Sequence, residues 1–99
     1  RDSWDTDPRQ LNRFAWWCFE NDVNLDEALD LALKGVELAE APGDQANILD
    51  TAAEICHKLG DCGKAVELMQ RAVELNPGRE YYKTQLARFE EILAEQGKG

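Results

Sequence analysis

The chain has 99 residues, the size of one ordinary domain, and its apolar fraction of 43% is typical of a globular protein and too high for a disordered one. Eleven lysines and arginines stand against twenty aspartates and glutamates, which gives a net charge of −9. This charge argues against binding to nucleic acid or to an anionic membrane surface, because both require a clustered basic face. No apolar run is long enough to span a bilayer.

The acidic charge leaves two interpretations open. It favours a basic partner segment, whose association would be accelerated by electrostatic steering, or it only keeps the domain soluble. The three cysteines, an odd number without a CxxC motif, argue against a disulfide scaffold and favour a reducing, cytoplasmic compartment. The chain begins with Arg1 rather than Met, so we expect it to be a piece of a longer protein, and the lack of a signal peptide then carries no information.

The first predicted elements follow a polar lead-in at residues 1–6. Asp7-Pro8 is typical of a helix start, with a capping carboxylate followed by proline at the first helical position. The predicted helix covers residues 8–21. Its apolar residues recur at helical spacing: Leu11, Phe14, Ala15, Cys18 and Phe19. Trp16 and Trp17 widen this stripe, which indicates burial on more than one side, and we expect Trp16 to be a core residue.

Two further helices are predicted in the middle of the chain. Asn24 is expected to cap a helix over residues 25–41, which the Ala41-Pro42-Gly43 stretch would end. Asp44 is expected to cap the next helix, which runs to about Leu59.

Glycine and proline mark the last two boundaries. Gly60 should end the third helix in the left-handed conformation, and Asp61 should cap a fourth helix that ends at Asn76-Pro77-Gly78. A fifth helix is predicted over about residues 80–96, followed by a frayed tail at 97–99. No stretch alternates with period two, so the predicted fold class is all-α, with five helices packed as antiparallel hairpins.

The second half of this pattern resembles the tetratricopeptide repeat (TPR) family, whose consensus places small and large residues at fixed positions of a helical hairpin. One unit reads Leu49, Ala52, Ala53, Cys56, Gly60, Ala65, Met69, Ala72 and Pro77. A second, more degenerate unit reads Asn12, Ala15, Trp16, Phe19, Ala28, Ala32 and Gly35. Phe19 and Ala28 are nine positions apart, as are Cys56 and Ala65, so two units share one internal spacing.

The resemblance implies a short right-handed superhelix in a single domain at residues 7–96. Its units would cover about residues 8–42 and 44–78, and residues 80–96 would form a solubilising cap. It also implies a protein–protein interaction module, a scaffold that holds an extended peptide or protein segment in a concave groove. The partner would be another protein or another domain of the same polypeptide.

Transferring the family's groove positions gives a candidate binding site without a catalytic residue. Its members are Arg13, Trp17, Glu20, Asn47, Asp50, Glu54, His57, Lys58, Tyr81 and Arg88. Trp17 is the principal candidate, either as an aromatic contact in an open groove or as a core residue covered by Trp4. Members of the family that grip a carboxylate use lysine, arginine and asparagine; only Arg13 matches, and Asp50 and Glu54 would repel such a group.

Two other functions compete with peptide binding. The domain could be purely architectural, a linker or oligomerisation segment within a larger protein. Its Ala-Trp-Trp run and repeat hairpin are similar to C-terminal extensions on thioredoxin-fold proteins, so the larger protein could have a thioredoxin fold. The domain could also be a metal or redox accessory, because Cys56, His57 and Cys62 are close in sequence. Neighbouring helical residues point about 100° apart, however, so Cys56 and His57 cannot easily share one metal, and we expect no metal site. The sequence has no glycine-rich phosphate loop and no serine–histidine pair, so we expect no cofactor and no enzymatic activity. Cys62, at the start of a helix, is the most reactive thiol predicted.

Overall fold

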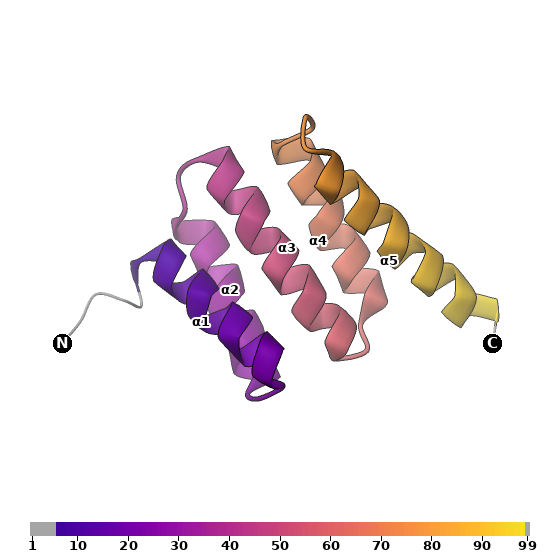
Figure 1. Cartoon of the computed structure of the whole chain (residues 1–99), viewed down its shortest axis with the longest axis horizontal. Coiled ribbons are helices and arrows are strands. Elements are labelled where there is room, and N and C mark those ends of the chain that lie inside the picture. Colours follow the sequence, from indigo (N-terminus) through magenta and orange to yellow (C-terminus); the bar gives the residue numbers. More distant parts are fainter. Residues whose placement is uncertain (1–5, 99) are drawn as a thin grey trace.

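The structure is a computed structural model that describes residues 6–98. It contains five helices, α1 (Pro8–Asn21), α2 (Leu25–Leu38), α3 (Pro42–Lys58), α4 (Cys62–Leu75) and α5 (Glu80–Lys98), and no strand within these residues. Consecutive helices run antiparallel, so the predicted all-α fold of helical hairpins is confirmed (Figure 1). Helices α1, α3 and α5 lie in the nearer layer of this view, and α2 and α4 lie behind them. In the described part of the chain, none of the helices combines the length and apolarity needed to cross a membrane.

Both predicted signals at the start of α1 are confirmed. The Asp7 carboxylate accepts a hydrogen bond from the backbone N–H of Arg9 at 3.0 Å, and Pro8 occupies the first helical position. The turn to α2 differs from the prediction in one detail. Asn24 is the residue before α2, but its side chain makes no capping hydrogen bond, because its backbone is left-handed (φ 50°) rather than extended as in an ordinary N-cap.

The connection between α2 and α3 is placed differently from the prediction. Helix α2 ends at Leu38 rather than Ala41, and α3 begins at Pro42 rather than after Asp44. Ala41 precedes a proline and is therefore extended, whereas Pro42 suits the first turn of a helix. Asp44 consequently lies in the first turn of α3, where its negative charge interacts favourably with the positive end of the helix dipole.

The hairpin of α3 and α4 is built as predicted. Gly60 is left-handed (φ +91°), and the Asp61 carboxylate caps α4 by accepting from the backbone N–H of Lys64 at 3.1 Å. Helix α5 extends beyond its predicted end, through Lys98, while Gly99 lies outside the described residues.

Small residues dominate the core where the helices cross. Ala28, Ala32, Ala52, Ala53, Ala65 and Ala72 are all fully buried. Larger apolar side chains fill the remaining space, with Leu49, Met69 and Phe89 completely enclosed. The alanines permit close approach of neighbouring helices, and this packing fixes which face of each helix is left for the surface.

Candidate functional site

The side of the molecule formed by α1, α3 and the start of α5 is hollowed. One hollow of about 400 Å³ is lined by Asn12, Arg13, Trp16, Asn47, Asp50, Thr51, Arg79 and Tyr81. A second hollow of about 220 Å³ is lined by Pro8, Arg9, Asn12, Arg13, Asp44, Asn47 and Ile48. Asn12, Arg13 and Asn47 line both, so the two hollows adjoin, and we call them together the α1–α3 groove.

Four of the ten predicted site residues line this groove: Arg13, Asn47, Asp50 and Tyr81. Trp17 does not. It is 53% exposed on another side of α1, where its ring stacks on Phe14 at 6.4 Å, and Trp4 lies outside the described residues. The aromatic residue that lines the groove is Trp16, which is 37% exposed and not the core residue predicted. The groove-facing stripe of α1 is therefore shifted by one residue from the predicted one.

Packing explains this shift. Leu11, Ala15 and Cys18 are completely buried and fix the inward face of α1. Asn12 and Trp16, four residues apart on one helical face, lie beside that buried stripe and border α3. The ring of Trp16 stacks on that of Phe19 with 4.8 Å between centroids, which holds the indole in place at the edge of the groove.

The remaining predicted residues lie apart from the groove. Glu20 is exposed and does not line it. Lys58 donates from Nζ to the backbone oxygen of Phe19 at 2.6 Å and lies over the ring of the same residue at 4.3 Å. It therefore joins α3 to α1. Glu54, His57 and Arg88 belong to two polar clusters between α3 and the helices that follow it, described next.

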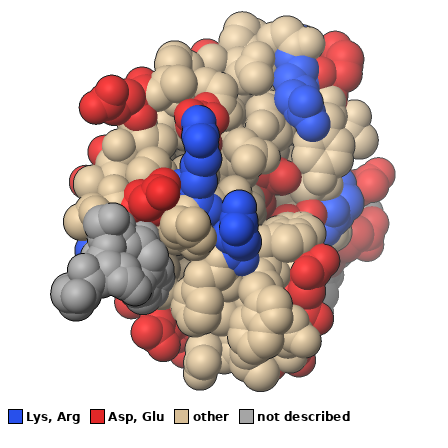
Figure 2. All heavy atoms as spheres, turned by 60° about the vertical axis from the view of Figure 1, so that its left-hand side comes forward, with Lys and Arg blue, Asp and Glu red and all other residues tan. Residues whose placement is uncertain are grey.

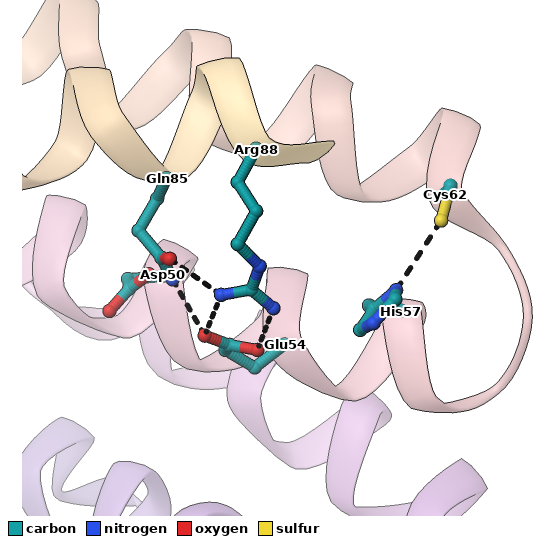
Figure 3. A network of polar contacts seen from close by, with 6 residues as sticks. All are labelled: Asp50, Glu54, His57, Cys62, Gln85 and Arg88. Atoms are coloured by element: carbon teal, nitrogen blue, oxygen red, sulfur yellow. Dashed lines mark hydrogen bonds and ion pairs between the residues drawn. The ribbon is translucent and has the colours of Figure 1, made fainter. Parts of the chain in front are cut away.

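The first cluster closes the α3–α5 side of the molecule (Figure 3). Gln85 of α5 donates from Nε2 to Asp50 Oδ1 at 3.0 Å and to Glu54 Oε2 at 2.6 Å. Arg88 binds both carboxylate oxygens of Glu54, at 3.1 and 3.2 Å, and donates to Gln85 Oε1 at 2.7 Å. Asp50 and Glu54 are each only 8% exposed. Glu54 is therefore paired with Gln85 and Arg88 and does not face the groove as expected. Asp50 does line the groove, but only a small part of its surface is exposed there.

The environment of Asp50 changes the pKa of its carboxyl group. Burial raises the pKa of its carboxyl above the ordinary value, the nearby Glu54 charge adds to the rise, and hydrogen bonds from Gln85 and Tyr81 oppose it. The pKa of the Tyr81 hydroxyl is also raised, first by burial and then by the charges of Asp50 and Glu54. The tyrosine therefore remains a neutral donor to Asp50 at neutral pH and presents its ring to the groove.

The second cluster joins the end of α3 to α4 and α5. His57 Nδ1 lies 3.4 Å from Cys62 Sγ, and Gln96 Nε2 donates to the same sulfur at 3.7 Å. Cys62 lies at the start of α4, as predicted, but it is only 2% exposed, and this burial limits access to the thiol that was predicted to be the most reactive. Burial also raises the pKa of the Cys56 thiol to about 11, with the Asp61 charge contributing, and burial followed by the charge of Glu27 raises that of Cys18.

Among the described residues, no group of three or more histidine, cysteine, aspartate and glutamate side chains is placed to hold a metal. The groove, in contrast, presents guanidinium, amide and aromatic groups side by side, which can bind a polar ligand. Asn12, Trp16, Thr51 and Arg79 are groove residues that the sequence reasoning missed. The i, i+4 spacing of Asn12 and Trp16 beside the buried Leu11 and Ala15 is the signal that could have found the first two.

Comparisons of the chain with family models, with curated proteins and with solved structures found no match.

Proposed function

We propose that the chain is a TPR-like interaction module that binds an extended segment of another protein in the α1–α3 groove. The TPR-like assignment is supported by the order of the hairpins and by Ala28, Ala65 and Ala72, which are fully buried where the resemblance expects small residues. In this function the chain acts by binding alone, without a catalytic step, and as part of a larger protein.

The observation that carries the proposal is the set of unused binding groups in one hollow. Within residues 6–98, the guanidinium of Arg13 makes no hydrogen bond or ion pair, and Trp16 offers a partly exposed indole held by Phe19. Asn12 Oδ1 is the one buried side-chain oxygen or nitrogen in this part of the chain without a partner. Leaving a buried acceptor unpaired costs roughly 1–3 kcal/mol, so a ligand N–H that reached it on a small local adjustment would recover energy.

A display library of random short peptides tests this function. We expect peptides that bind the wild-type chain to lose binding to an Arg13→Ala/Trp16→Ala variant and to keep binding to a Trp17→Ala variant, with helical circular dichroism unchanged in all three. The Trp17 variant is the matched control, because it removes an even more exposed indole from the same helix outside the groove. Equal loss in both variants would assign the binding surface to another side of α1.

One observation favours the architectural function as a second candidate. Trp17 is more than half exposed and stacks on Phe14, so α1 carries a large aromatic surface beside the groove. Such a surface suits permanent packing against a neighbouring domain or a second copy. Sedimentation of the wild-type chain and of Trp17→Ala distinguishes the two functions: a concentration-dependent dimer that the substitution abolishes supports the architectural one, and a monomer in both cases removes the oligomerisation form of it.

A further inference from the structure

The local charge of the α1–α3 groove is opposite to that of the chain. The chain carries a net charge of −9, yet the groove is lined by Arg9, Arg13 and Arg79 against Asp44 and Asp50. Asp50 is almost fully buried, and its carboxylate already accepts from Gln85. Figure 2, in which the left-hand side of Figure 1 comes forward, shows basic side chains near the middle of this side of the molecule, with acidic side chains next to them and around them.

These guanidinium groups are available to a ligand. Within the described residues, the side chains of Arg9 and Arg13 form no hydrogen bond or ion pair. In the same part of the chain, the guanidinium of Arg79 forms no hydrogen bond or ion pair and lies over the rings of Tyr81 and Tyr82, 5.5 and 5.4 Å from the ring centroids. Stacking on a ring leaves the N–H edge of a guanidinium free, and that edge matches a carboxylate in a two-bond geometry.

We propose that the α1–α3 groove selects acidic segments: an internal glutamate or aspartate side chain binds Arg13 and Arg79, while a neighbouring aromatic residue packs on Trp16 and Tyr81. This inference rests on the proposed function and specifies its partner. The overall charge of the chain favours a basic partner, but the basic groups of such a partner would meet three arginines in the groove. A nucleic acid is disfavoured, because its repeated phosphates would extend beyond the groove onto the surrounding acidic surface.

Three matched peptides test the inference. Each is a hexapeptide in which the test residue alternates with phenylalanine between a first and a last glycine. The test residue is glutamate, glutamine or lysine. The peptides are acetylated and amidated, so their ends carry no charge. Binding to the wild-type chain is followed by nuclear magnetic resonance of the indole N–H groups. We expect the glutamate peptide to bind about tenfold more tightly than the glutamine peptide, as one charge-assisted contact provides, and the lysine peptide to bind more weakly still.

Matched charge variants identify the groups responsible. Arg13→Gln and Arg79→Gln should each lower the affinity for the glutamate peptide about tenfold and leave that for the glutamine peptide unchanged. Arg71→Gln removes the same charge from a hollow between α2 and α4 and should change neither. A loss of affinity in Arg71→Gln equal to that in Arg13→Gln would show a nonspecific charge effect and overturn the inference.

The outcomes separate this inference from the proposed function. If the glutamine or lysine peptide shifts the Trp16 indole with equal or higher affinity, the groove binds peptides but does not select acidic ones, so the inference is wrong and the proposed function stands. If neither these peptides nor any library peptide shifts that indole, both are wrong.

Discussion

Replacing Gln85 by methionine should strongly destabilise the fold, because Gln85 is the buried donor that two carboxylates share. It is 5% exposed, and its Nε2 lies 3.0 Å from Asp50 Oδ1 and 2.6 Å from Glu54 Oε2. Methionine keeps the unbranched shape and the helix propensity but donates no hydrogen bond. Each hydrogen bond to a charged group contributes roughly 1.5–3 kcal/mol, so the loss of two such bonds should lower the free energy of unfolding by about 3–6 kcal/mol.

The loss should depend on pH in a defined direction. The pKa of Asp50 is raised above its ordinary value of 3.8, so the folded chain holds this proton at a higher pH than the unfolded chain does. Asp50 therefore contributes stability as the pH falls through its folded pKa toward 3.8, and that contribution is absent above the folded pKa. Without Gln85 the pKa rises further, and a protonated Asp50 can itself donate to Glu54. The destabilisation by Gln85→Met should therefore be smaller in mild acid than at neutral pH.

Urea denaturation followed by circular dichroism measures both effects, since a domain of this size is expected to unfold in one step. Gln70→Met, at an exposed position of α4, is the control and should change the free energy of unfolding by no more than about 0.5 kcal/mol. A loss below about 1 kcal/mol at neutral pH, or a loss that increases in mild acid, would refute the view that Gln85 holds α5 to α3 by bridging the two carboxylates.

Three further predictions concern packing and thiol access. Gly35→Ala should stabilise the chain by about 0.5–1 kcal/mol in urea denaturation, since Gly35 is helical, in the last turn of α2, and the new Cβ would meet atoms no closer than 3.5 Å; a loss of stability would show that the crossing needs glycine. Ala65→Leu should cost about 1–3 kcal/mol by overpacking, and a variant that melts with the parent would contradict the close crossing of α3 and α4. Cys18, Cys56 and Cys62 are buried, so Ellman's reagent should react slowly until the chain is denatured, and rapid reaction of Cys62 in the native chain would contradict its burial.

Local signals made most of the fold predictable from the sequence. The Asp7-Pro8 and Gly60-Asp61 pairs each determine a boundary through their own backbone chemistry, and both boundaries are where they were predicted. The start of α3 was misplaced because Pro42 and Asp44 are competing start signals only two residues apart, and the extended backbone before proline decides between them.

The site was less predictable because it depends on how helices pack. Trp16 and Trp17 are adjacent and chemically identical, and only the rotation of α1 against α3 determines which of them lines the groove. Gln85 and Arg88 have the composition of a solvated face on a capping helix, yet they bury the carboxylates of residues more than thirty positions earlier in the chain. Such a pairing has no local signal, since its partners meet only after α5 has docked.

The most direct test of groove binding compares the two adjacent indoles during titration with a peptide selected from the library. Nuclear magnetic resonance resolves the N–H signals, and the Trp16→Phe and Trp17→Phe variants assign them. We predict that the Trp16 signal shifts and saturates with the peptide while the Trp17 signal stays in place. A saturating shift of Trp17 with an unmoved Trp16 would contradict the account and locate the binding surface on the side of α1 that carries Trp17 and Phe14.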